Sequence, residues 1–144
     1  MTVPRSNTRS LRRELLSTLS DVDIFCDQAA ELLRDAGLRD EEFAVQMLLR
    51  ESLNNAIVHG NDGLRTKRIC VEVRIGKRLI VIRIADEGQG FDWKHAETVM
   101  PDADSISGRG LPIYALYATR ISFNQKGNQV TFARRINGDK DGSV

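Results

Sequence analysis

The feature that most constrains the fold is a pair of apolar stretches joined by a short loop. From Ile69 to Ile75, apolar side chains alternate with Cys70, Glu72 and Arg74, which is the pattern of a strand with one buried face. A second apolar stretch spans residues 79–85, and Gly76 begins the loop between the two. Short glycine-containing loops between such stretches are typical of β-hairpins. The sequence therefore predicts an antiparallel hairpin in the middle of the chain.

A first helix is expected before this hairpin. Ser20-Asp21 is a favourable N-cap pair, and apolar residues then recur at helical spacing. Gly37 stands where a C′ glycine belongs, so we predict a helix over about residues 21–36. Upstream of it, residues 11–19 fit either a first strand or the approach to this helix.

A second helix is expected from Asp40, which is placed to cap it, to about His59. The run Gly60-Asn61-Asp62-Gly63 then supplies turn residues that stop a helix. This helix and the first one both precede the hairpin in the chain.

The C-terminal part of the chain adds a short helix and a second pair of strands. Residues 111–117 indicate a helix with Pro112 in its first turn, where proline is tolerated. Residues 119–124 and 129–136 predict strands. Because strands and helices do not alternate one by one, the fold class is α+β. We expect a two-layer α/β sandwich, with a mixed, mostly antiparallel sheet and helices on one face.

The composition is that of one ordinary globular domain. Within the 144 residues, we expect a loose segment over 1–8, a domain over 9–137 and a disordered tail over 138–144. The net charge of +1 leaves no basic footprint for nucleic acid. The N-terminus lacks the apolar segment of a signal peptide, and no apolar run is long enough to cross a bilayer. We therefore expect a cytoplasmic protein that contacts neither nucleic acid nor membrane.

Several familiar sites are excluded by the sequence. No glycine-rich dinucleotide fingerprint feeds a helix, and neither a P-loop nor the loops of protein kinases occur. The two cysteines, Cys26 and Cys70, have apolar neighbours, which predicts two buried thiols. Their spacing does not indicate a metal site.

One polar pair interrupts the second helix. On a helical wheel of about 100° per residue, Glu51 and Asn55 fall in the middle of an otherwise apolar arc. They are i and i+4, so their side chains point into the same space. An amide oxygen can bind a hard cation that also holds phosphates, and a carboxylate can accept a proton from an attacking hydroxyl. Taken alone, the pair fits a solvated patch equally well.

Two glycine turns follow later in the chain. Asp86-Glu87-Gly88-Gln89-Gly90 comes directly after the hairpin, and Gly108-Arg109-Gly110 directly precedes the helix at 111–117. Glycines at spacing two permit close backbone approach to a ligand, and a glycine loop that feeds a helix N-terminus suits phosphate. The carboxylate of Asp86 can accept a hydrogen bond from an exocyclic amine. Each turn alone also fits an ordinary loop.

The order of these motifs resembles the GHKL ATPases of the Bergerat fold, a superfamily that includes gyrase and sensor histidine kinases. Glu51-Ser52-Leu53-Asn54-Asn55-Ala56 resembles their N box. Asp86-x-Gly88-x-Gly90 resembles their G1 box, and Gly108-x-Gly110 resembles their G2 box. The size of the chain, the absence of an appended histidine-bearing hairpin and the run from Asn55 to Gly60 look like the stand-alone anti-sigma-factor serine kinases.

This resemblance implies a role for each matching residue. Asn55 would bind Mg²⁺, Glu51 would be the general base, and Asp86 would recognise the adenine amino group. Gly88 and Gly90 would let the chain pass close to the nucleotide. The residues expected around the phosphates of ATP are His59, Gly108, Arg109, Gly110 and Leu111.

The resemblance also implies a function. It predicts an anti-sigma factor that binds Mg-ATP, phosphorylates a serine of a STAS-domain anti-anti-sigma protein, and binds a sigma factor in the alternative complex, as a homodimer. One alternative is an ATP-binding module that sequesters a partner without kinase turnover. Another is a detached histidine-kinase ATP domain, which Glu51 disfavours because sensor histidine kinases more often carry asparagine there.

Overall fold

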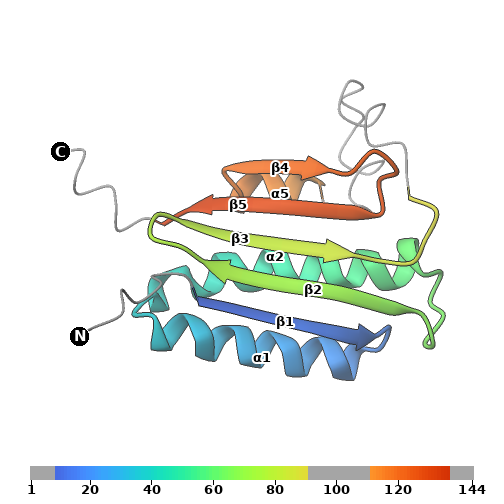
Figure 1. Cartoon of the computed structure of the whole chain (residues 1–144), viewed down its shortest axis with the longest axis horizontal. Coiled ribbons are helices and arrows are strands. Elements are labelled where there is room, and N and C mark those ends of the chain that lie inside the picture. Colours follow the sequence, from blue (N-terminus) through green and yellow to red (C-terminus); the bar gives the residue numbers. More distant parts are fainter. Residues whose placement is uncertain (1–8, 91–110, 137–144) are drawn as a thin grey trace, which may run out of the picture.

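Helices cover one face of a five-stranded sheet, so the molecule has two layers (Figure 1). The computed structural model describes residues 9–90 and 111–136. The strand order is β1-β2-β3-β5-β4, and each neighbouring pair is antiparallel. The predicted α+β sandwich is therefore confirmed, with antiparallel pairing throughout the described sheet. The strands are β1 (Arg9–Leu16), β2 (Arg68–Ile75), β3 (Leu79–Ala85), β4 (Arg120–Phe123) and β5 (Gln129–Arg135).

The central hairpin, β2 and β3, forms as the apolar alternation predicts. Val73 pairs with Ile82, and Val71 pairs with Ile84. All four side chains are buried on the inner face of the sheet. The turn closes where the Gly76 amide donates to the Leu79 carbonyl at 2.8 Å.

Most of residues 11–19, which the sequence left as either a strand or the approach to the first helix, belong to the strand β1. It pairs with β2 along its whole length, from Arg9 opposite Ile75 to Leu16 opposite Arg68. Its apolar pattern is weak because it lies at the edge of the sheet, where Leu15 is its one buried residue. Pairing with β2, rather than local pattern, therefore specifies this strand.

The first helix, α1 (Leu19–Asp35), begins earlier than predicted. Its N-cap is Thr18, whose hydroxyl accepts a hydrogen bond from the Asp21 amide at 3.2 Å, so the prediction of a Ser20-Asp21 cap was wrong. The Asp21 carboxylate instead accepts from the Leu16 amide at 2.9 Å and joins the end of β1 to the helix. Gly37, with φ of 75°, ends the helix as predicted.

The second helix, α2 (Glu42–Asn55), follows a short 3₁₀ turn, η1 (Arg39–Glu41). Asp40 lies inside this turn and caps neither element, which corrects the predicted start. Glu41 is 1% exposed, and its carboxylate accepts a hydrogen bond from Arg134 Nε at 2.8 Å. Because a buried carboxylate is costly without a partner, this ion pair fixes the start of α2 against β5.

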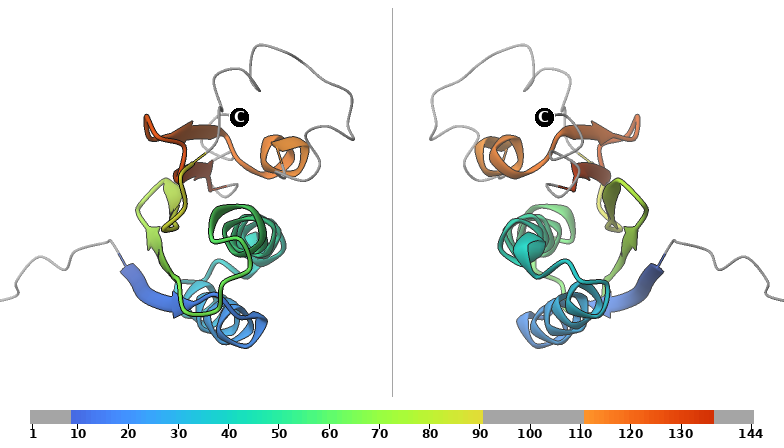
Figure 2. Two further views of the ribbon diagram at one scale, coloured as in Figure 1. Left: turned by 90° about the vertical axis from the view of Figure 1, so that its right-hand side faces the viewer. Right: turned by 90° about the vertical axis from the view of Figure 1, so that its left-hand side faces the viewer.

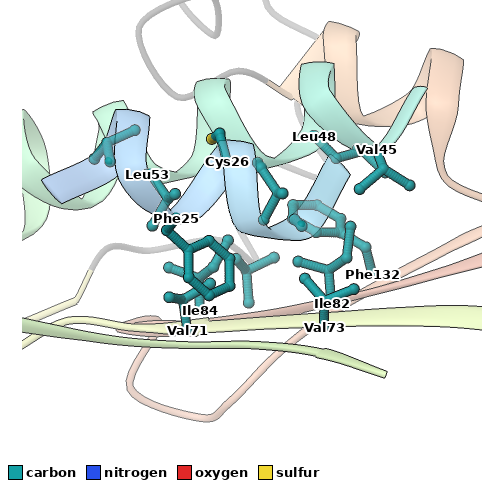
Figure 3. Packing of buried hydrophobic residues seen from close by; sticks show 14 of the residues in the cluster. Phe25, Cys26, Val45, Leu48, Leu53, Val71, Val73, Ile82, Ile84 and Phe132 are labelled. Carbon is teal, nitrogen blue, oxygen red and sulfur yellow. The ribbon is translucent and has the colours of Figure 1, made fainter. Parts of the chain in front are cut away.

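The core lies between α1, α2 and the inner face of the sheet (Figure 3). Phe25 points from α1 toward the sheet side chains (Figure 3), and burial raises the pKa of the Cys26 thiol on the same helix to about 11. Cys70 is only half-buried because it occupies an outward position of β2, so the prediction of two buried thiols was wrong for this one. Cys70 lies in a groove on the open face of the sheet, lined also by Arg12, Glu72, Arg83, Ala85 and Gln129.

The third helix, α5 (Leu111–Tyr117), has the predicted bounds. It lies on the same side of the sheet as α1 and α2 (Figure 2). The Tyr114 ring contacts Phe132 of β5 edge-on, with centroids 4.6 Å apart, and the Tyr117 ring contacts Phe43 of α2 at 5.8 Å. α5 is therefore held against both the sheet and α2. Within residues 9–90 and 111–136, no helix is long and apolar enough to cross a bilayer.

Candidate functional site

Three segments far apart in the sequence meet at one end of the sheet. They are the C-terminal end of α2, the end of β3 and the turn between β4 and β5 (Figure 1). The pocket between them brings together Asn55 and Asp86, which the sequence singled out from separate motifs. Its described lining is Ser52, Asn55, Ala56, Gly60, Ile84, Asp86, Tyr114, Phe123, Gly127, Asn128, Gln129 and Val130.

The polar pair on α2 differs in its relation to this pocket. Asn55 lines it, and its side-chain nitrogen donates to the Tyr114 hydroxyl at 2.8 Å. Glu51 is half-buried one turn earlier on the same helix and does not belong to the described lining. Asn55 therefore faces whatever the pocket holds, and Glu51 stands beside the pocket rather than in its wall.

Helix α2 ends in a widened turn, η2 (Ala56–Gly60), which has the hydrogen bonding of a π-helix. The Asn61 amide donates to the Ala56 carbonyl at 2.8 Å, five residues back. Such turns are rare and occur frequently at functional sites. Here the turn brings Gly60 into the pocket wall and leaves His59 exposed, outside the described lining.

Asp86 lies at the end of β3 and is half-buried. Hydrogen bonds hold both its backbone and its side chain. Its amide donates to the Asn128 carbonyl at 2.9 Å, and its carboxylate accepts from the Gly88 amide at 2.8 Å. Gly60 lies directly against this carboxylate, so a Cβ at Gly60 would overlap it. The carboxylate is therefore held at one position in the pocket wall.

Gly88 and Gly90 are required by packing within the protein. A Cβ at Gly88 would overlap the carbonyl of Gly60, and one at Gly90, where φ is 84°, would overlap the carbonyl of Lys126. The close approaches seen are thus between the glycine turn, η2 and the β4–β5 turn. Contact of these glycines with a nucleotide stays a prediction.

Three asparagines that the sequence did not predict as site residues hold the segments of the site together through hydrogen bonds. Asn61 is fully buried; its side chain accepts from the Glu87 amide at 2.8 Å and donates to Ser17 and the Arg68 carbonyl. Asn128 donates to the Asp86 carbonyl at 3.2 Å, and Asn124 accepts from three backbone amides of its own turn. Turn residues of this type bond to backbone groups, but only the fold shows which ones.

The second glycine turn, Gly108, Arg109 and Gly110, lies outside the described residues. Leu111, the first residue of α5, follows this turn directly. Tyr114, one turn further along α5, is 3% exposed and lines the pocket. The helix after the second glycine turn therefore contributes to the same site as Asn55 and Asp86.

Comparison with known families shows what kind of domain carries this pocket. A family model described as the histidine kinase-like ATPase domain matches residues 15–134. The chain belongs to this family. The match includes both Asn55 and Asp86, and membership in this ATPase family implies that the domain binds ATP. No match was found among curated proteins.

The donor set of this ATPase domain fits a nucleotide that brings its own cation. Within the described parts of the chain, no group of three His, Cys, Asp or Glu side chains could hold a metal ion. Mg²⁺ in nucleotide sites is commonly bound by one or two protein oxygens together with substrate phosphates. The amide of Asn55 in the pocket wall can supply such an oxygen, and the Asp86 carboxylate can accept from an amine.

Proposed function

We propose that this histidine kinase-like ATPase domain is an anti-sigma-factor serine kinase. It binds Mg-ATP and transfers the γ-phosphoryl group to a serine of a STAS-domain anti-anti-sigma protein, which regulates transcription. Its other partner is a sigma factor, which it binds in a complex alternative to the one with the STAS-domain protein. It acts as a cytoplasmic homodimer. The observation that carries the proposal is the position of Glu51 one helical turn before Asn55, with Asn55 in the wall of the pocket.

The proposed roles are those that the resemblance to the GHKL ATPases implies. Asp86 accepts a hydrogen bond from the adenine amino group, and Asn55 holds Mg²⁺, which neutralises charge on the phosphates when it is bound. Gly108, Arg109, Gly110 and the start of α5 at Leu111 close over the phosphates, with His59 near them.

The transfer step uses Glu51 as a general base. The serine oxygen of the partner forms a bond to the γ-phosphorus, while the bond from that phosphorus to the β–γ bridging oxygen breaks and ADP leaves. The serine proton passes to the Glu51 carboxylate. Because phosphoryl transfer depends mainly on positioning and charge stabilisation, a site of this size suffices.

A transfer assay with the purified chain, γ-labelled ATP and a STAS-domain partner tests the proposal. We expect an acid-stable phosphoserine on the partner. Glu51→Gln keeps the size of the side chain but removes the base, so transfer should fall by a factor of roughly 10² or more, with ATP affinity unchanged. Glu42→Gln is the matched control, because this carboxylate lies on the same helix and bonds Arg34 instead.

Each alternative function gives its own result in this assay. A sequestering module would bind Mg-ATP and its partner without transferring phosphate. A detached histidine-kinase domain would transfer phosphate to histidine and give an acid-labile product. Full activity of Glu51→Gln would show that Glu51 is not the base.

A further inference from the structure

We propose that Tyr114 is a positioning residue that sets the orientation of the Asn55 side chain and thereby controls how strongly Mg²⁺ increases ATP affinity. The inference rests on the proposed role of Asn55 as the Mg²⁺ ligand. The observation that motivates it is the hydrogen bond from Asn55 Nδ2 to the Tyr114 hydroxyl, 2.8 Å long, between residues 59 positions apart in the chain.

The position of the Tyr114 hydroxyl is fixed by the core. The side chain is 3% exposed, and its ring packs edge-on against the fully buried Phe132, with the ring planes at 61°. A ring held in this way cannot move its hydroxyl without disturbing the inner face of the sheet. The hydroxyl is therefore a fixed reference point in the pocket wall.

An asparagine amide has two unlike ends, and only its oxygen can bind a cation. The hydrogen bond to Tyr114 engages the nitrogen. Because a tyrosine hydroxyl can accept from the nitrogen or donate to the oxygen, the bond fixes the place of the amide in the pocket wall, and of its two orientations the structure has the one in which the nitrogen donates. In the observed one, the oxygen is the atom that remains for Mg²⁺, so the ligand is oriented before the cation arrives.

The helix that carries Tyr114 is itself held at its C-terminal end. Arg134 donates to the Tyr117 carbonyl at 2.7 Å, and the same guanidinium bonds the buried Glu41 carboxylate at the start of α2. α5 and α2 are therefore linked at one end through Arg134 and at the other through Tyr114 and Asn55. This double attachment makes the hydroxyl a positioning group rather than a chance contact.

Calorimetric titration of the full chain with ATP, in excess Mg²⁺ and in EDTA, tests the inference. Tyr114→Phe keeps the ring and removes the hydroxyl. We expect the factor by which Mg²⁺ increases ATP affinity to fall roughly three- to tenfold, which is the size of one hydrogen bond, while the affinity in EDTA changes by a smaller factor. Tyr117→Phe is the matched control on the same helix and should change neither affinity.

A double variant separates action through Asn55 from direct contact with ATP. In an Asn55→Ala background, Tyr114→Phe should cause no further loss of the Mg²⁺ effect. Additive losses, an equal loss of affinity in EDTA, or no effect of Tyr114→Phe at all would overturn the inference. Transfer is not measured here, so a chain that binds Mg-ATP but lacks kinase activity would refute the kinase proposal and leave this one standing.

Discussion

Gly60 has no side chain at the point where the end of α2 meets the end of β3. Its Cα faces the Asp86 carboxylate, and its carbonyl faces Gly88. A side chain at Gly60 would therefore displace the carboxylate that we expect to contact adenine. Gly37 offers a contrast, because it has φ of 75° but open space around the position of a Cβ. One glycine is needed for close packing at the site, and the other for backbone conformation alone.

Gly60→Ala should therefore weaken ATP binding more than it destabilises the fold. We expect at least a tenfold loss of affinity, with about 1–2 kcal/mol lost from the free energy of unfolding through overpacking. Gly37→Ala should cost about 1 kcal/mol because alanine disfavours the left-handed conformation, with ATP affinity unchanged. Urea denaturation and calorimetry measure the two quantities. Wild-type affinity in Gly60→Ala would show that the Asp86 position does not matter for binding.

The residues of the site were predictable to different extents. Asn55 and Asp86 stand out in the sequence because a polar group on an apolar helix face, or an aspartate before a glycine turn, is visible locally. Tyr114 and Asn61 are not visible in this way, because each acts through partners that are distant in the chain. Asn61, for example, bonds Ser17, 44 residues away. The contact of Gly88 with a nucleotide stays a prediction, and the backbone that Gly88 packs against, that of Gly60, is visible only in the fold.

At the scale of elements, the buried pair Arg134–Glu41 joins β5 to the start of α2. Its side chains are 16% and 2% exposed, and the two atoms Arg134 Nε and Glu41 Oε1 are 2.8 Å apart. The exposed pair Arg68–Glu14 is its natural comparison, since both side chains there are about 60% exposed and the atoms are 2.9 Å apart. Burial, rather than distance, distinguishes the two pairs.

Arg134→Ala should be strongly destabilising because it leaves the Glu41 carboxylate buried without this cation. We expect a loss of about 3–5 kcal/mol in the free energy of unfolding, measured by urea denaturation. Arg68→Ala should cost less than about 1 kcal/mol, because water screens an exposed pair. Similar losses for the two variants would mean that the Arg134–Glu41 pair does not anchor α2.

The elements themselves were predictable where local pattern and tertiary structure agree. The β2–β3 hairpin and α5 have the predicted bounds almost to the residue, since alternation and helical spacing mark them. The starts of α1 and α2 were less predictable, because several residues near each start could act as the cap. In α1 the cap is Thr18 rather than Ser20-Asp21, because the Asp21 carboxylate instead accepts a hydrogen bond from the end of β1. A contact between elements of this kind leaves no mark on the local sequence.

At the scale of the whole molecule, the two thiols report on different parts of the fold. Cys70 lies in the groove on the open face, where a reagent can reach it. Cys26 is fully buried, and its pKa is raised from 9.0 to about 11 by burial. Because the folded state holds this thiol protonated, its contribution to stability is complete below pH 9.0 and is lost as the pH rises toward 11. Labelling at about pH 8 thus avoids this loss.

Cys26 should react with a thiol reagent only when the whole domain unfolds, because it lies in the core between α1, α2 and the sheet. In the native chain we expect one fast phase from Cys70 and one slow phase from Cys26, and Cys70→Ser should remove only the fast phase. Mg-ATP at about 100 times its Kd should slow the Cys26 phase roughly 100-fold, because a ligand that binds only the folded state adds about 2.7 kcal/mol of stability. The Cys70 phase should keep its rate. If Mg-ATP left the Cys26 rate unchanged, the pocket would not be the ATP site of one cooperatively folded domain.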